Sequence, residues 1–446
     1  MQIEERKGPT SLPIELLEQV IGIIQDPVSL KACSRVSQTF AALAQKHIFH
    51  EILFTPQSSL NVTGETFRRF FDLLQESPHI AHYVQEIVID ATFLAASTRN
   101  QCLQRTLPLL KELRKIGLSK KHVSVDSFWW YFMDVETRDA LLDVFRSPLI
   151  TDIDLTGIRD FPPEECFVFT PSLKNLSLPT LVFDRSSIDP LAYLLNPQSS
   201  SSSPCFATST PPTCSTLVAS RPKLESLTII DVLDNGLTLP WLASPASISP
   251  VDLAELETLR LDFEEVTSTN NQDSSKLDMA MSLFSRTLTR FRLNVLQRNM
   301  AYFLWSETQG WSSLPRSSIH PPNLSILSML DCMIIDSKIF QHPIGSDRPL
   351  SYRSPLPWIA WLLDGSADLE LKKLILNISF RGIARTILLN LDWRRLTEAL
   401  SARMKWKGTT VELHFRNIES TGVEALDSNE SFAELASRGV TILYRS

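Results

Sequence analysis

The chain has 446 residues, of which 43% are hydrophobic and 21% charged, a composition that excludes wholesale disorder and indicates a globular protein with a core. Its formal net charge of -7 lacks the excess of Lys and Arg that nucleic-acid binding requires, so we expect no nucleic-acid partner. The charged start, MQIEERKGPTSLP, is unlike a signal peptide, and no run of about 18 apolar residues follows. We therefore expect no membrane span and a cytoplasmic or nuclear location.

Residues 12–53 predict three short helices. Pro13 suits the first turn of the first helix, in which apolar residues recur on one face. That face comprises Ile14, Leu17, Ile21 and Ile24. Asp26 precedes Pro27 and can cap the second helix, and a third amphipathic stretch begins near Phe40. A module of about 40 residues without a metal or disulfide buries too little surface to be stable alone, so we expect it to need a partner.

The same segment has a recognisable order of residues: L-P-x-E-L-L, an apolar helix, a break with Asp, then S-L-x-x-C-S-x-V-S-x-x-F and a closing aromatic. The residues concerned are Leu12, Pro13, Glu15, Leu16, Leu17, Val20, Ile24, Asp26, Leu30, Cys33, Val36, Phe40 and Phe49. This order resembles the F-box family. Phe40 stands where that family most often has Trp, and Ser37 stands where a basic residue is frequent. The elongin-binding box is a poorer match, because it places its Cys four residues after the Leu rather than three.

The resemblance implies that residues 10–53 form an F-box that docks on a Skp-type adaptor and, through it, on a cullin. The implied adaptor-binding residues are Leu12, Pro13, Glu15, Leu16, Val20, Ile24, Leu30, Cys33, Val36 and Phe40. The chain would then recruit a protein substrate to a ubiquitin ligase without being an enzyme itself. Residues 1–9 would form a flexible tail. Alternatively, the helices only cap a repeat domain, which leaves an interaction scaffold without a ligase connection.

Beyond residue 53, strand-like hexads recur with apolar residues at positions one, four and six. They are Val84/Ile87/Ile89, Ile150/Ile153/Leu155, Leu173/Leu176/Leu178, Leu224/Leu227/Ile229, Leu256/Leu259/Leu261, Leu288/Phe291/Leu293, Leu324/Leu327/Met329 and Leu371/Leu374/Leu376, with looser copies at Val411/Leu413/Phe415 and Val440/Ile442/Tyr444. Parallel strands need crossover segments, and helices are expected at 65–77, 101–116, 136–147, 276–286 and 393–404.

These patterns predict an α/β fold in which residues 54–446 form an irregular leucine-rich-repeat-like solenoid, with parallel strands on its concave face and helices outside. A doubly wound α/β sheet is the open alternative. The Ser-, Thr- and Pro-rich stretch 196–222 is expected to be a disordered insertion, and 267–276, 311–322 and 341–357 are expected to be loops.

The sequence contains few residues arranged as catalytic or metal-binding motifs. Phosphate-binding glycine loops, G-x-S-x-G and H-E-x-x-H are absent, and the six cysteines include no C-x-x-C pair, so we expect no cofactor, no metal site and free, mostly buried thiols. Asp152 and Asp154 form a D-x-D that a metal-dependent transferase could use. They flank Ile153 in a predicted strand, however, which turns both carboxylates to water.

The concave face of the predicted sheet is the expected site for a substrate. Side chains alternate along a strand, so the third and fifth positions of each hexad face outward. These positions are Asn175, Ser177, Ser226, Thr228, Thr258, Arg260, Arg290, Arg292, Ile326, Ser328, Lys373 and Ile375. Arg260, Arg290, Arg292 and Lys373 are therefore candidates for binding an acidic or phosphorylated peptide. The other interpretation is a solvated face balanced by Asp262 and neighbouring carboxylates.

Overall fold

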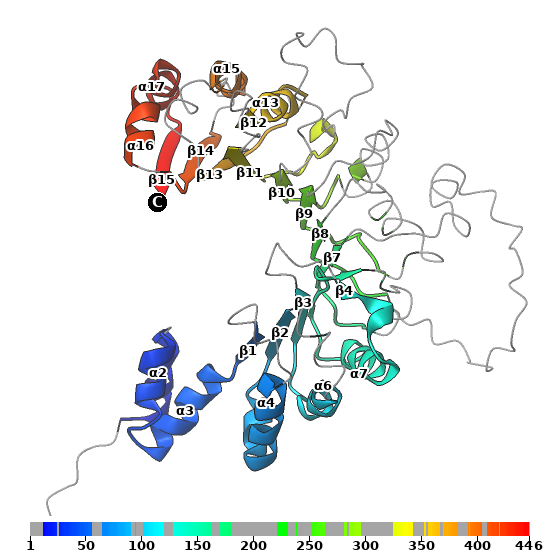
Figure 1. Ribbon diagram of the computed structural model, residues 1–446. Helices are drawn as coiled ribbons and strands as arrows, with labels where there is room; N and C mark the ends of the chain where they lie inside the picture. Colours follow the sequence, from blue (N-terminus) through cyan, green and yellow to red (C-terminus); the bar gives the residue numbers. More distant parts are fainter. Residues whose placement is uncertain are drawn as a thin grey trace, which may run out of the picture. The chain divides into compact units, whose positions relative to one another are not determined.

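The computed structural model comprises two compact units, Met1–Ile158 and Arg159–Ser446 (Figure 1). The structure describes residues 12–24, 26–55, 65–90, 94, 101–119, 128–159, 161, 170–179, 221–230, 238, 242, 249, 251–263, 281–282, 285–295, 324–341, 352–353, 356–365, 369–381, 391, 393–403, 408–418 and 420–445. The predicted tail at 1–9 and the loops at 267–276 and 311–322 lie outside these residues, as does the predicted insertion except for its last two positions.

The N-terminal segment forms the three predicted helices, α1 (Ile14–Ile23), α2 (Pro27–Cys33) and α3 (Gln38–Ile48). Asp26 caps α2 as predicted, because its carboxylate accepts a hydrogen bond of 2.8 Å from the backbone N–H of Ser29. Ser37 caps α3 in the same way. The buried residues of these helices are small in number: Ile21, Leu30 and Ala44. We call this segment, residues 12–48, the helical module.

The rest of the first unit is a parallel sheet whose strands follow the chain order. The strands are β1 (Glu51–Phe54), β2 (Glu86–Asp90), β3 (Lys115–Ser119) and β5 (Asp152–Asp154). The short strands β4 (Phe128–Trp129) and β6 (Ile158–Arg159) pair with each other. The helices are α4 (Glu65–Glu76), η1 (Pro78–His82), α6 (Cys102–Thr106), η2 (Leu107–Leu109), η3 (Trp130–Phe132) and α7 (Val135–Phe145). Phe54 of β1 stacks on Phe67 of α4 with ring centres 4.0 Å apart, which fixes that helix on the sheet.

The second unit contains a longer parallel sheet, again in chain order. Its strands are β7 (Asn175–Pro179), β8 (Ser226–Ile230), β9 (Thr258–Phe263), β10 (Arg290–Val295), β11 (Cys332–Gln341), β13 (Lys373–Arg381), β14 (Thr410–Arg416) and β15 (Thr441–Arg445), and β12 (Tyr352–Arg353) pairs antiparallel with β11. The helices are η6 (Leu324–Ile326), α13 (Leu356–Gly365), α15 (Trp393–Arg403), α16 (Ser420–Asp427) and α17 (Glu430–Ser437). In Figure 1, α13, α15 and α17 lie along one side of this sheet.

Most predicted hexads occupy strands in a common register. Leu176 pairs with Leu227, and the apolar column continues through Leu259, Phe291 and Met333, all of which are buried. The looser copies at 411–415 and 440–444 are also strands, β14 and β15. The strand order within each unit lacks the reversal of a doubly wound sheet, so the α/β arrangement is compatible with a solenoid.

One hexad was predicted in the wrong place. Leu324/Leu327/Met329 is not a strand, because Leu324 begins a short 3-10 helix and Met329 is exposed. The strand here is β11, and its apolar pattern is Leu330/Met333/Ile335, six residues later. The positions predicted for Ile326 and Ser328 on the sheet face are consequently taken by Cys332 and Ile334.

Three of the five predicted helices are confirmed. Those at 65–77, 136–147 and 393–404 are confirmed as α4, α7 and α15, whereas most of 276–286 lies outside the described residues. The helix predicted at 101–116 ends at Thr106, because Pro108 lacks the N–H that would continue it. The end of the loop predicted at 341–357 is wrong as well, since α13 begins at Leu356.

The core of the second unit includes an aromatic cluster beneath its last strands. Trp393 of α15 meets Phe415 of β14 and Phe432 of α17 edge to face, with ring centres 5.8 Å and 5.0 Å apart. Tyr444 of β15 stacks on Phe415, and its hydroxyl donates a 2.6 Å hydrogen bond to the carboxylate of Asp427. Among the described residues, no helix has the length and apolar character needed to cross a membrane.

Candidate functional site

The first helix of the helical module carries two sets of apolar residues on neighbouring faces, one packed inward and one exposed. In the first set Leu17 and Ile24 are half-buried, and Ile21 is fully buried. The second set comprises Leu12, Leu16, Val20 and Ile23, with exposed fractions of 61%, 46%, 55% and 78%. We call this second set the α1 stripe. The spacing of Leu16, Val20 and Ile23 places them along one face of the helix, and Leu12 lies just before its start. An amphipathic helix of a self-contained domain would carry polar residues there.

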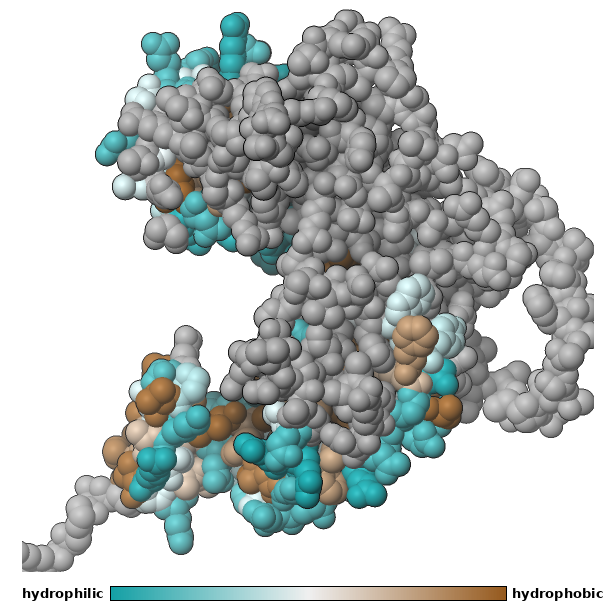
Figure 2. Space-filling model, viewed as in Figure 1, coloured by the Kyte–Doolittle hydropathy of each residue, from teal (hydrophilic) through white to brown (hydrophobic). Residues whose placement is uncertain are grey.

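Further apolar side chains are exposed elsewhere in the helical module. Val28 at the start of α2 is 74% exposed, and Val36, between α2 and α3, is 67% exposed. Figure 2 shows hydrophobic residues gathered on the surface of these helices. Single exposed apolar residues are ordinary, but this many on so small a module form an apolar surface that the module itself leaves uncovered.

The predicted adaptor-binding residues divide into three groups. Exposed residues are Leu12, Pro13, Glu15, Leu16, Val20 and Val36, and half-buried ones are Ile24, Cys33 and Phe40. Leu30 is buried, so its side chain belongs to the small core of the module and does not reach the surface. The exposed Ile23 and Val28 were missed, although Ile23 follows Val20 by three residues and could have been found as part of a second apolar face.

A second candidate region is one face of the sheet in the second unit. It consists of alternate residues of β9 and β10, beginning with the first residue of each strand, and of the residues paired with them in register on β11, β13 and β14. We call it the charged face. Its members are Thr258, Arg260, Asp262, Arg290, Arg292, Asn294, Cys332, Ile334, Asp336, Lys373, Ile375, Asn377, Thr410, Glu412, His414 and Arg416. Arg260 and Arg292 are paired in register, as predicted, and strands of one sheet lie about 4.8 Å apart.

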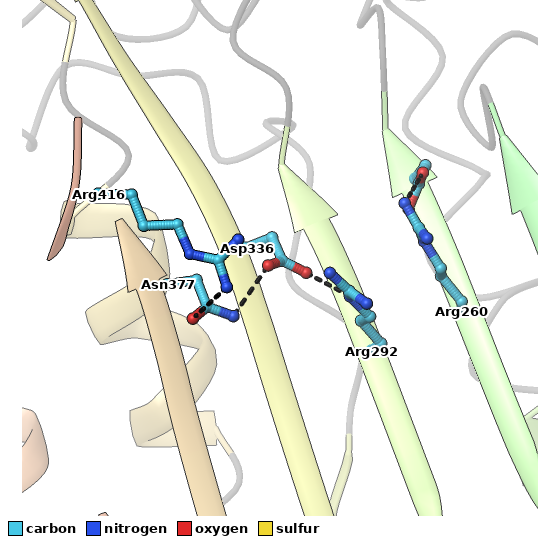
Figure 3. Close-up of polar contacts among 6 residues, drawn as sticks. Arg260, Arg292, Asp336, Asn377 and Arg416 are labelled. Carbon is cyan, nitrogen blue, oxygen red and sulfur yellow. Dashed lines mark hydrogen bonds and ion pairs between the residues drawn. The ribbon is translucent and has the colours of Figure 1, made fainter. Parts of the chain in front are cut away.

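A network of polar contacts orients most of the charged groups on this face (Figure 3). Arg260 holds Asp262 with two hydrogen bonds of 2.9 Å and 2.8 Å. The Nε of Arg292 donates to one oxygen of Asp336 at 2.5 Å, and the amide of Asn377 donates to the other at 2.9 Å. The sequence-based expectation of a basic cluster therefore has to be modified, because two of the three arginines already neutralise carboxylates.

Lys373 likewise has a carboxylate partner. Its ammonium group lies 2.7 Å from Glu412, and the other oxygen of Glu412 lies 2.9 Å from His414 Nε2. The Lys373 hydrogen bond is the main cause that holds the pKa of Glu412 below its ordinary value, against the opposing effect of burial. Among these cations Arg290 differs: it is exposed, and none of the described residues forms an ion pair or hydrogen bond with its guanidinium.

This pKa shift predicts a pH dependence. A carboxyl group with a lowered folded-state pKa stabilises the fold above its unfolded pKa, about 4.3, and that contribution is lost as the pH falls through the folded value. We expect the free energy of unfolding of the second unit to fall between about pH 5 and pH 3, and Glu412→Gln to flatten this slope. Urea titrations followed by circular dichroism would measure it. Glu398→Gln, on the exposed side of α15, is the control, and an unchanged slope in Glu412→Gln would contradict the assignment.

Asp152 and Asp154 lie where the sequence predicts. Ile153 is buried between them, and both carboxylates make local contacts, with the Thr151 hydroxyl at 2.6 Å and the Thr156 N–H at 3.0 Å. No group of three or more His, Cys, Asp or Glu with metal-binding geometry occurs in the described part of the chain. The described cysteines Cys33, Cys102 and Cys332 are free and half-buried, less buried than predicted.

Fold and surface together define an α/β protein whose parallel strands follow the chain order, with a small helical module that exposes an apolar face at its start. No protein-family model matches the sequence. The curated proteins also include no match.

Proposed function

We propose that the chain is a substrate-recruiting adaptor of a Skp/cullin/F-box ubiquitin ligase. The helical module would dock on the Skp-type subunit as an F-box, and the repeat-like sheet region would bind the protein substrate. The chain itself would make no bond. It would hold a substrate lysine close to a charged conjugating enzyme, and proximity would supply the rate.

The observation that carries this proposal is the α1 stripe. The helix buries Ile21 but exposes Leu16, Val20 and Ile23 on the neighbouring face, so the module covers only part of the apolar surface of this helix. The F-box-like order of residues runs through the same helix, and Leu12, Leu16 and Val20 belong to both. The exposed surface and the motif therefore coincide.

The energy available is sufficient for specific docking. Burying a Leu, Ile or Val side chain fully is worth about 1.5–3 kcal/mol relative to leaving it in water. Several such residues together can offset the cost of association, which is why fully buried apolar anchors dominate interfaces. The exposed Glu15 adds a carboxylate beside these anchors that can give the docking a fixed register.

The test is binding of the full chain to an immobilised, purified Skp-type adaptor. Val20→Asp puts a charge in the middle of the α1 stripe, and we expect it to weaken binding by about 30-fold or more, since it loses the buried side chain and desolvates a carboxylate. The dissociation constant by surface plasmon resonance is the readout. Leu12→Ala combined with Pro13→Ala should weaken binding in the same direction.

Val135→Asp is the matched control. Val135 has nearly the same exposed fraction as Val20, 56%, but lies at the first position of α7, where an acidic residue is compatible with the helix dipole. It should bind the adaptor like the wild type. A wild-type chain that ignores the adaptor, or equal losses in Val20→Asp and Val135→Asp, would leave the protein as a repeat-like interaction scaffold without a ligase connection.

A further inference from the structure

The charged face carries an excess of positive charge in a protein that is acidic as a whole. Its cations are Arg260, Arg290, Arg292, Lys373 and Arg416, and its carboxylates are Asp262, Asp336 and Glu412. The net charge of the whole chain is -7. Positive charge is therefore concentrated on this face, which gives it a field that attracts acidic partners.

The arrangement of these groups leaves donors available to a ligand. Arg290 makes no ion pair or hydrogen bond with any described residue, and it is exposed. Arg292, two positions along β10, contacts Asp336 through Nε, and its side chain is 39% exposed. The two guanidinium groups project from the same face of one strand, about 7 Å apart along it. Because Asp336 is also held by Asn377, Arg292 is fixed in place before any ligand arrives.

Cys332 lies between two of the cations. Cys332 of β11 is in register with Arg290 of β10 on one side and with Lys373 of β13 on the other. The small thiol therefore lies between two cationic side chains on neighbouring strands. Burial raises the pKa of the Cys332 thiol, and the positive charges of Arg290 and Lys373 oppose that rise. The Cys332 thiol therefore separates two positive groups, of which Lys373 already holds Glu412 and Arg290 holds no described carboxylate.

We propose that the charged face binds an acidic, extended segment of a partner protein, with Arg290 and Arg292 as its main contacts. An extended peptide repeats its side chains on one face at the same spacing as β10, so alternate carboxylates can meet the two arginines in turn. This proposal deepens the proposed function, because it names the chemical class of segment that the adaptor would recruit.

The face favours an acidic protein over a nucleic acid. Nucleic-acid grooves combine many cations with aromatic side chains on which bases stack, and the charged face has no Phe, Tyr or Trp among its described members. Its carboxylates at Asp262, Asp336 and Glu412 would also repel a continuous phosphate backbone. A few spaced carboxylates meet the cations without that penalty.

The test uses the full chain and a fluorescein-labelled dodecapeptide of alternating Glu and Ser, with its Gln and Ser counterpart as the neutral probe. Fluorescence anisotropy should show binding of the Glu peptide, weaker binding of the Gln peptide by about tenfold, and a decrease with added salt. Arg290→Glu should reduce binding of the Glu peptide by about tenfold or more, and Arg290→Gln by less.

Arg68→Glu is the matched control, since it changes the net charge by the same amount at an exposed position of α4. It should bind the Glu peptide like the wild type. The proposal is overturned by equal affinity for the two peptides, by no binding of either, by equal losses in Arg290→Glu and Arg68→Glu, or by an oligonucleotide of the same charge that displaces the Glu peptide at lower concentration. Adaptor binding, which depends on the helical module, should stay unchanged in Arg290→Glu. Adaptor binding therefore tests the proposed function, and peptide binding tests the charged face independently.

Discussion

Ile21→Ala is expected to unfold the helical module while the strands of both units stay folded. Ile21 is fully buried, and truncating such a side chain costs about 2–5 kcal/mol. The only other buried residues of the three helices are Leu30 and Ala44, so the module has little further stability to lose. Hydrogen exchange measured by mass spectrometry should show protection lost across α1 to α3.

Ile23→Ala provides the contrast within the same helix. Ile23 is 78% exposed, so the same truncation should leave the hydrogen-exchange protection of the module unchanged. Under the proposed function it should weaken adaptor binding directly, whereas Ile21→Ala should weaken it through the unfolded fraction, which excess adaptor can restore. Unchanged protection in Ile21→Ala would show that the module does not depend on this core.

Trp393→Ala should cause the largest loss of stability in the second unit. Trp393 is 2% exposed and contacts Phe415 and Phe432, so its removal leaves a large cavity between α15, α17 and β14. Truncations of buried Phe and Trp typically cost about 3–5 kcal/mol. We expect the urea transition of this unit, followed by far-ultraviolet circular dichroism, to move to lower urea by that amount of free energy.

Trp129→Ala serves as the comparison for this substitution. Trp129 is 40% exposed in the first unit, where its main ring contact is Phe132 at 6.2 Å. Its loss should change the free energy of unfolding by less than about 1 kcal/mol. If both tryptophan variants shifted the transition equally, the aromatic cluster would not be the core that the packing indicates.

The sequence predicted the strands well because each one buries alternate residues on a single side. Leu227, Leu259 and Phe291 follow one another in register, and the hexads that contain them were identified without the structure. The buried side of a strand must be apolar, and this requirement produces an alternation of apolar residues that is recognisable in the sequence.

Two strands were misplaced or missed for specific reasons. Leu324/Leu327/Met329 imitates a hexad only six residues before the true one, and nothing local marks Leu324 as the start of a 3-10 turn. Leu113, Ile116 and Leu118 also have the hexad spacing, but the first two fell within the helix predicted at 101–116, which ends at Thr106 because of Pro108.

For the candidate sites, the sequence predicted which residues belong to each site but not which contacts these residues make. Arg260 and Arg292 were placed side by side correctly, yet the pairing of Arg292 with Asp336 could not be seen, because it depends on the register of the misplaced strand. Similarly, the α1 stripe needs knowledge of which side of α1 the other helices cover. One apolar face looks like the other until Ile21 is known to be the buried one.

The strand register has a consequence for protein engineering. Leu176 pairs with Leu227 and Leu227 pairs with Leu259, although residues 180–225 separate the first two strands and only 231–257 separate the next two. The entropic cost of loop closure rises by only about 0.6 kcal/mol for each doubling of loop length. We therefore expect an epitope tag or a reporter domain inserted between β7 and β8 to leave the strand pairing on either side unchanged.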